Sequence, residues 1–365
     1  MSVWRLLVAA VLGLVLSSAA LAAVTPKRIF VVSSYHKEYL WSQSTQRGLV
    51  AALLKYRYLD NEQQAQAFTL HDQVESSRAV LRKVWMDTKR RNSQLELAAA
   101  ADRIMKEIRA FRPDLVMLGD DNAANYIGNL LLDTATPVVF WGINGLPLKY
   151  GLIDEMDRPG HNITGVWQQG YHQESLELLS KLVPSAKTFA ILACDSETAR
   201  PNIKRIQSLA SAGKLPLKLV GTVSTNSFEE FKTRALAMST TVDAFFVLNH
   251  DTMKDANDNH VDMLEVGRWY LRNIRKPEAS PEDQFVLEGM LLTANDYGYN
   301  QSYLAFEMAY DVLEQGISPA RMRARAPARG PLMVNTMRAR MLGIKLDDKR
   351  HLIEDLVDTA AALKK

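Results

Sequence analysis

Polar and aromatic side chains follow the short apolar runs of this sequence, where they could bind a small ligand. The first group, Ser34, Tyr35 and His36, comes directly after the β-branched run at residues 28–33, and Trp41 lies a little further on. Hydroxyl and imidazole groups can hydrogen-bond a carboxylate, and aromatic rings can stack on a ligand ring. The alternative for Trp41 is a place in the hydrophobic core.

Two adjacent acids follow the apolar run at residues 114–118. Asp120 and Asp121 lie between Gly119, which permits a tight exit from a strand, and Asn122. Asp121 or Asn122 can cap the helix that follows, but capping explains only one acid. The other acid could supply the counter-charge for a ligand ammonium, so both interpretations stay open.

The run at residues 137–141 ends in Trp141 and leads into a loop that contains Gly142, Asn144 and Gly145. Glycines let backbone amides approach a ligand closely, and the Asn144 side chain offers both a donor and an acceptor. Trp141 either forms an aromatic wall of the site or fills the core.

Two apolar runs in the second half of the chain, at residues 188–193 and 242–248, end in the same way. The polar residues that follow them are Asp195, Ser196, Thr198, Asn249 and Asp251. Some of these can act as helix caps or turn residues, but their position after apolar runs indicates a ligand site. Cys194 is interpreted as a small buried residue rather than a nucleophile, because no histidine lies near it in the sequence.

The sequence gives no sign of a catalytic or metal site. Residues 255–260 resemble the start of a calcium loop, but His260 stands where that loop needs glycine and Val266 where it needs Glu. The spacing of His250 and His260 matches no zinc pattern. A Gly-x-Ser-x-Gly elbow, a phosphate loop and a dinucleotide fingerprint are also missing. We therefore expect no enzyme activity, no metal and no cofactor.

Alternating strand and helix patterns predict the elements that position these residues. In the first half, strands are predicted at 28–33, 65–71, 114–118 and 137–141, and helices at 43–56, 95–111 and 122–132. In the second half, strands are predicted at 188–193, 217–223, 242–248 and 284–293, and helices at 174–182, 199–209, 228–238 and 260–274. Apolar runs bounded by turn residues are typical of buried parallel strands.

This order predicts an α/β protein with two lobes, each a doubly wound parallel sheet. Ligands of such sheets bind beyond the carboxyl ends of the strands, which is where the polar groups described above are found. A helix at 304–315 and the tail from residue 331 follow both lobes, so the chain is expected to cross between lobes more than once.

The first 22 residues have the layout of a secretory signal peptide. Arg5 precedes the apolar run at residues 6–16, and Ala20 and Ala22 form a small-x-small cleavage pattern. The alternative is an uncleaved anchor, but the run is short for a span of ~20 residues. The only cysteine, Cys194, is far from the cleavage site and cannot accept a lipid there. We expect an exported, periplasmic protein.

Composition sets further bounds on the exported chain. Removing 22 of the 365 residues leaves 343, enough for two lobes with separate cores. The removed segment holds one basic and no acidic residue, so the net charge falls from +3 to +2, which favours neither nucleic acid nor a membrane surface as partner. A single cysteine forms no internal disulfide. The arginine-rich segment 320–329 is interpreted as a solvated loop. Separately, we expect the exported protein to be a monomer.

Several segments together resemble one family, the periplasmic substrate-binding proteins of ABC transporters that are related to tryptophan- and tyrosine-binding components. The segments are 33–36 with Trp41 and Gly48, 119–123, 137–144, 162–166, 305–316, 333–335 and 342–344. The resemblance covers nearly the whole exported chain. It implies a type I periplasmic-binding-protein fold, in which two α/β lobes joined by a hinge enclose the ligand.

In this family, loops at the strand ends of both lobes line the cleft, which agrees with the polar groups identified above. The expected lobes are residues 23–167 with about 292–325, and residues 168–291 with about 326–365. The sequence departs from the family pattern around residues 288–290, and Tyr297 occupies the turn that should face the ligand.

The resemblance implies that the protein captures a small solute by closing its lobes and delivers it to a membrane permease. The paired acids and the aromatic residues favour an amino-bearing ligand, such as an amino acid or an aromatic solute. The alternative is a module that reports the bound solute to a membrane sensor kinase. Genes for a permease and an ATPase beside the gene for this protein would indicate transport, whereas a gene for a kinase would indicate sensing.

Overall fold

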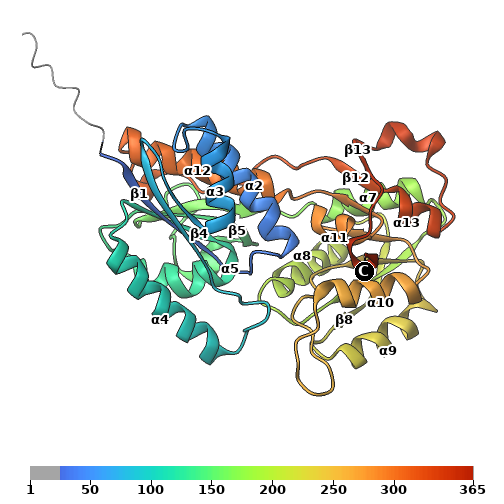
Figure 1. Ribbon diagram of the computed structural model, residues 1–365. Coiled ribbons are helices and arrows are strands. Elements are labelled where there is room, and N and C mark those ends of the chain that lie inside the picture. Colours follow the sequence, from blue (N-terminus) through green and yellow to red (C-terminus); the bar gives the residue numbers. More distant parts are fainter. Residues whose placement is uncertain (1–24, 365) are drawn as a thin grey trace, which may run out of the picture.

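The computed structural model describes residues 25–364, so the predicted signal peptide at 1–22 lies outside the described residues (Figure 1). The chain folds into two sheets with flanking helices, which form the two lobes seen side by side in Figure 1. Within the described part, no helix combines the length and the apolar character needed to cross a membrane.

The first sheet has the strand order β2-β3-β1-β4-β5-β6. Its strands are β1 (Lys27–Ser33), β2 (Gln73–Glu75), β3 (Ala79–Trp85), β4 (Leu115–Gly119), β5 (Val138–Asn144) and β6 (Ile163–Gln168). All neighbouring strands are parallel except β2, which pairs antiparallel with β3. Strands β4 and β5 are buried along their whole length, as expected for parallel strands covered on both faces.

Helices cover both faces of this sheet. One core lies under α2 (Leu40–Lys55), α3 (Glu62–His71) and α12 (Gly298–Gln315), and the other under α4 (Gln94–Phe111) and α5 (Asp120–Ala123). A π-helical turn (Ala124–Gly128) and the short helix α6 (Asn129–Leu131) continue α5, and a 3-10 turn (Pro147–Tyr150) follows β5.

The second sheet has the strand order β13-β12-β11-β10-β9-β7-β8. Its strands are β7 (Thr188–Ala193), β8 (Lys218–Ser224), β9 (Ala244–Val247), β10 (Glu278–Ser280), β11 (Leu292–Ala294), β12 (Leu332–Asn335) and β13 (Asp355–Val357). Only the pairing of β11 with β12 is antiparallel. The flanking helices are α7 (His172–Leu182), α8 (Ala199–Ser211), α9 (Phe228–Ser239), α10 (Met263–Asn273), α11 (Asp283–Glu288) and α13 (Thr336–Met341), and three 3-10 turns (Pro319–Arg321, Asp347–Leu352 and Ala361–Leu363) complete the chain.

The predicted class, α/β with two doubly wound, parallel-dominated sheets, is confirmed. The chain passes between the sheets after β6, after β11 and before β12, because α12 returns to the core of the first sheet. Strand β11 belongs to the second sheet, so residue 292 lies inside that sheet and the returning segment begins a few residues later than predicted. The predicted lobe boundaries otherwise remain an interpretation of the sequence.

The prediction of a strand at residues 65–71 is wrong, because these residues belong to α3. The Asn61 side chain accepts a hydrogen bond from the backbone of Gln64 and starts the helix, and Ala65 and Phe68 face the core one turn apart. The strand beside β1 is instead β3, in which Arg82 and Lys83 interrupt the apolar pattern.

The prediction of strand structure across residues 284–293 is also wrong for its first part. Residues Asp283–Glu288 form the short helix α11, and only Leu292–Ala294 form a strand. A buried six-residue segment is too short for its periodicity to separate helix from strand.

A buried ion pair holds the second lobe together on the side of β10. Arg338 of α13 donates to Glu278 of β10 through Nε at 2.9 Å and Nη2 at 3.0 Å, and neither side chain is exposed. Arg338 Nη2 also donates to the Ile274 carbonyl at 3.0 Å, and Glu278 accepts from the Leu291 backbone at 2.9 Å. One charged pair therefore fixes α13, β10 and the end of α10 relative to one another.

We predict that Glu278→Gln lowers the free energy of unfolding by about 3–5 kcal/mol, because it leaves the Arg338 guanidinium buried without its counter-charge. Chemical denaturation followed by circular dichroism measures this change. Asp358→Asn is the matched control, since its ion pair with Arg340 is more than half exposed and should contribute less than about 1 kcal/mol. Equal losses in both variants would contradict the prediction.

Candidate functional site

A cavity of ≈ 260 Å³ lies where strand ends of the two sheets face each other. Its first wall comes from residues after β3 and β4, and its second wall from residues after β7, β8 and β9. The lining residues are Thr88, Lys89, Asn92, Gln94, Leu97, Asn122, Asn125, Tyr126, Asp195, Ser196, Glu197, Thr198, Arg200, Asn226 and Thr252. Ligands of open α/β sheets bind at this edge.

The lining is almost entirely polar, with Leu97 and Tyr126 as its apolar and aromatic members. Charges of both signs are present, and some are already paired. Arg200 donates to Asp195 at 2.7 Å and to Glu197 at 3.1 Å. A cavity of this kind fits a small polar solute with both donors and acceptors.

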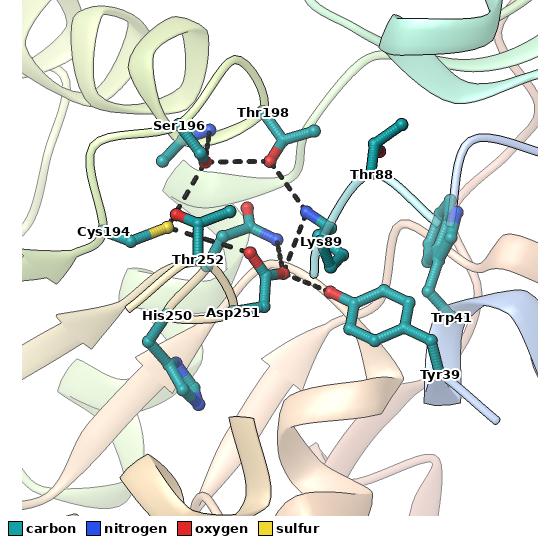
Figure 2. A network of polar contacts seen from close by, with 12 residues as sticks. Tyr39, Trp41, Thr88, Lys89, Cys194, Ser196, Thr198, His250, Asp251 and Thr252 are labelled. Atoms are coloured by element: carbon teal, nitrogen blue, oxygen red, sulfur yellow. Dashed lines mark hydrogen bonds and ion pairs between the residues drawn. The ribbon is translucent and has the colours of Figure 1, made fainter. Parts of the chain in front are cut away.

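Lys89 forms the centre of a buried network at the back of this cavity (Figure 2). Its Nζ lies 3.0 Å from Asp251 Oδ2 and donates to Thr198 Oγ1 at 3.2 Å, and it lies 4.2 Å from the centre of the Tyr35 ring. Both charged side chains are about 3% exposed. Lys89 follows β3 of the first sheet, whereas Thr198 follows β7 and Asp251 follows β9 of the second sheet. The ion pair between Lys89 and Asp251 therefore joins the lobes.

Asp251 receives further hydrogen bonds in the same network. The Tyr39 hydroxyl donates to Asp251 Oδ2, and Asn249 Nδ2 donates to the same oxygen at 3.2 Å. Burial acts to raise the pKa of Asp251, but the charge of Lys89 and the Tyr39 hydrogen bond outweigh burial and hold that pKa below its usual value. Asp251 is therefore ionised at neutral pH, and its charge is satisfied by residues of both lobes.

Two further hydrogen bonds connect the lobes beside the cavity. Asn202 Nδ2 donates to Asn144 Oδ1 at 2.9 Å, and the Tyr150 hydroxyl shares its one proton between Glu197 Oε1 at 3.0 Å and Asp121 Oδ1 at 2.8 Å. These bonds directly join residues of opposite lobes, so the two walls of the cavity contact each other in this structure.

Asp121, predicted to be a counter-charge or a cap, instead organises the loop after β5. It is fully buried and accepts from Asn144 Nδ2, Lys149 Nζ and the Tyr150 hydroxyl, each at 2.8 Å. Both carboxylate oxygens are occupied and its charge is paired with Lys149. Asp121 thereby holds Asn144 and Tyr150 in position for their bonds to the second lobe.

Asp120 lies next to Asp121 but has a different environment. Its backbone has a φ of 69°, and its carboxyl group accepts from Trp41 Nε1 at 2.7 Å. Burial raises the pKa of Asp120 from 3.8 to about 8, so the group is largely protonated at neutral pH. Neither Asp120 nor Trp41 lines the cavity, and both side chains are buried.

The first predicted group is also mostly buried beside the cavity. Ser34 Oγ donates to the Gly119 carbonyl at 2.6 Å and accepts from the Ala123 backbone at 2.8 Å, which ties β1 to β4 and α5. The His36 ring lies 3.5 Å from Asp87. Neither Ser34 nor His36 lines the cavity, whereas Tyr35 faces the Lys89 ammonium.

Two predicted aromatic residues lie elsewhere. Trp141 is fully buried in the core under α2 and α12 and packs against Gly119, so it fills the core rather than forming an aromatic wall. Tyr297 precedes α12 on the segment between the sheets, where it stacks on Tyr299, and it does not line the cavity. Of the predicted residues, Asn122, Asp195, Ser196 and Thr198 line the cavity directly.

Sequence reasoning missed Thr88, Lys89 and Asn92, because these residues follow β3 and that strand was not predicted. Asn226 was also missed, although it follows β8, a strand that the sequence does predict. The rule that ligands bind at carboxyl ends of strands would have identified all four residues once the strands were known. Among residues 25–364, no three His, Cys, Asp or Glu side chains are grouped to hold a metal ion.

Two lobes of parallel-dominated sheet with a polar cavity between their strand ends are the architecture of the type I periplasmic-binding-protein fold. The family model of ABC transporter substrate binding proteins matches residues 83–353, so the chain belongs to this family. No match was found among curated proteins.

Solved structures of this class resemble the chain in fold. A domain from Streptococcus pneumoniae in complex with L-Trp is 18% identical, with a TM-score of 0.68 over 91% of this chain and 100% of the other. A ligand-free, open substrate-binding protein with adhesive properties from Clostridium difficile is 20% identical, with a TM-score of 0.64 over 91% and 99%. A conserved domain protein from Vibrio cholerae is 15% identical, with a TM-score of 0.69 over 91% and 100%.

Asp120→Asn should change how stability depends on pH. The folded-state pKa of Asp120 is raised to about 8, so the contribution of this group to stability is fully present below about pH 4, falls as the pH rises, and becomes constant above about pH 8. Asparagine retains the acceptor for Trp41 and tolerates a positive φ, and it does not titrate.

We therefore predict that the free energy of unfolding of Asp120→Asn increases relative to wild type between about pH 4 and pH 8. Urea denaturation of both proteins across this range measures the difference. Parallel pH profiles would show that the Asp120 pKa is not raised.

Proposed function

We propose that this protein is the periplasmic solute-binding component of an ABC importer. In this proposal it captures a small amino-acid-like solute between its lobes and presents the closed complex to a membrane permease. The observation that carries the proposal is the polar cavity, whose walls come from strand-end loops of both lobes, with direct hydrogen bonds between those loops beside it. Family membership supports the same conclusion.

The lining residues favour a polar, zwitterionic ligand. The lining carries bases, Lys89 and Arg200, and acids, Asp195 and Glu197, and a zwitterion would bind by taking the place of partners in the existing pairs of Arg200 with these two acids. Tyr126 and Leu97 supply a limited apolar surface for a ligand side chain. The solved relative in complex with L-Trp supports the amino-acid class, while the many polar lining groups favour a ligand more polar than tryptophan.

Closure of the lobes would couple binding to delivery. A ligand that contacts both walls gains interactions only in the closed state, so it shifts the equilibrium towards closure. The bonds from Tyr150 to Glu197 and from Asn202 to Asn144 would form in the same step. The permease could then distinguish loaded from empty protein by shape.

The location follows from the same proposal. Substrate-binding proteins of this family act outside the cytoplasm. We propose that residues 1–22 are the cleaved signal peptide and that the exported protein acts as a monomer with the permease as its partner.

We predict that one amino-acid-like compound raises the melting temperature of the exported protein after bound solute has been removed. A ligand at a hundredfold its Kd adds about 2.7 kcal/mol, which corresponds to a shift of a few degrees. A thermal-shift panel of amino acids, sugars, purines and polyamines measures this effect. A panel without any hit would contradict the proposed ligand class.

Cavity variants test where that compound binds. Asn122→Leu and Thr198→Val should each weaken binding about tenfold or more, because each removes a hydrogen-bonding group from the lining. Asn273→Leu at the exposed end of α10 is the control and should leave the affinity unchanged. Unchanged affinity in both cavity variants would place the ligand elsewhere.

Tyr150→Phe tests closure separately from ligand contact. Tyr150 does not line the cavity, but its hydroxyl bonds to Glu197 of the other lobe. We predict a several-fold loss of affinity and, in small-angle X-ray scattering, a smaller fraction of compact molecules at equal ligand concentration. Wild-type scattering and affinity would contradict a role of this bond in closure.

A further inference from the structure

Three buried acids lie near the segments that connect the two lobes. Glu282 and Asp283 stand at the start of α11 in the second lobe, and Asp296 lies in the segment between β11 and α12. The backbone of Asp283 donates to Asn295 Oδ1 at 2.9 Å, and the backbone of Asp296 donates to the Pro281 carbonyl at 3.0 Å, so the two segments lie side by side. None of the three acids lines the cavity, and none is more than 3% exposed.

The first lobe covers Glu282 and Asp283 with the N-terminal part of α2. Ser44 Oγ of α2 donates to Asp283 Oδ2 at 3.3 Å, a hydrogen bond that crosses between the lobes. Glu282 also acts across this contact, because its charge helps, after burial and Asp251, to raise the pKa of Tyr39. Both acids are therefore buried where one lobe meets the other.

The hydrogen-bond donors to these three carboxyl groups in the described part of the chain are all neutral. They are the side chains of Gln284, Ser44 and Gln301 and the backbone amide of Gly170. Asp283 Oδ1 has no partner among residues 25–364. Asp251, which also lies between the lobes, is in contrast paired with Lys89 at 3.0 Å. Glu282 and Asp283 are thus buried without a cation in contact.

Burial without a counter-charge favours the protonated form of a carboxyl group. Burial raises the pKa of Asp283 from 3.8 to about 6, although Arg47 acts against this change. Burial and the charge of Asp296 raise the pKa of Glu282 well above its usual value, and Lys89 offsets them only in part. Both acids therefore hold protons more tightly in this arrangement than in water.

Asp296 differs from the other two acids in its surroundings. Its carboxylate accepts from the Gly170 backbone and from Gln301 Nε2, both at 2.7 Å. Burial raises the pKa of Asp296 to about 6, against these two hydrogen bonds and the charge of Arg205. Its partners belong to a connecting segment and to α12 rather than to the facing surfaces of α2 and α11, so we assign it only an electrostatic effect on Glu282.

Separating α2 from α11 would return Glu282 and Asp283 to water. A hydrated carboxyl group is ionised at neutral pH, so the separated lobes would bind fewer protons than the lobes in contact. Since the pKa of each acid is raised by the contact, its contribution to closure is fully present below the pKa of the hydrated group. That contribution is lost as the pH rises through the raised value.

We propose that closure of the lobes takes up protons at Glu282 and Asp283, so that acidic pH favours the closed, solute-binding form. The inference rests on the proposed function, because it requires lobes that open and close. It adds a second ligand, the proton, which binds outside the cavity and is coupled to the solute through closure. By linkage, solute binding takes up protons to the same extent that acid promotes solute binding.

Small-angle X-ray scattering of the solute-free exported protein between pH 5 and pH 8 is the test. We expect the closing equilibrium constant of wild type to fall with rising pH, by up to about tenfold per pH unit for each proton taken up. A double variant, Glu282→Gln with Asp283→Asn, retains oxygen acceptors at both positions but does not titrate. It should be more compact than wild type at pH 8 and should depend less on pH. Glu265→Gln, at an exposed position of α10, is the control and should follow wild type.

A double variant that scatters like wild type at every pH, or that is less compact at pH 8, would overturn the proposal. Asp283→Asn alone should shift the pH profile in the same direction by a smaller amount, and it serves as the test if circular dichroism shows that the double variant is unfolded. The measurement uses no solute. Unchanged scattering together with a hit in the thermal-shift panel would therefore reject proton coupling and leave solute binding intact, whereas the expected scattering without a hit would support proton coupling alone.

Discussion

A buried ammonium group joins the two lobes of this protein. Lys89 comes from the first lobe, and its carboxylate partner, Asp251, comes from the second at 3.0 Å. An ion pair in a poorly hydrated interior is strong, but removing both charges from water costs nearly as much. Opening the lobes would therefore separate the pair while restoring its hydration. Under the proposed function, this balance would let the lobes open and close, with a bound solute supplying the difference.

The loops around this pair are positioned by acids that do not contact the cavity. Asp121 binds Lys149, Tyr150 and Asn144, and two of these three residues then bond to the second lobe. Asp120, one residue earlier, is buried without a cation in contact, and its pKa rises accordingly. The two neighbouring carboxylates thus have different surroundings, because Asp121 contacts a lysine whereas Asp120 contacts only a tryptophan N–H.

The cavity between the lobes depends on the residues that follow β3. Residues 79 and 81 of this strand face the core under α2 and α3, and Lys83 is buried beside Gln46 of α2. Immediately beyond the strand end, Thr88 and Lys89 enter the cavity between the lobes. This strand, which lies between β2 and β1, therefore brings polar groups to the cavity because its carboxyl end reaches the cleft.

The sequence by itself determined the α/β class, the two sheets, most strands and helices, and the sheet edge at which polar residues gather. These features depend on local apolar patterns, which are set by neighbours in the chain. Only the tertiary structure decided that β3 rather than residues 65–71 lies beside β1, that Trp141 and Asp120 are buried, and that Lys89 meets Asp251. These outcomes depend on contacts between residues far apart in the chain, and burial and charge pairing at such contacts cannot be deduced from local patterns.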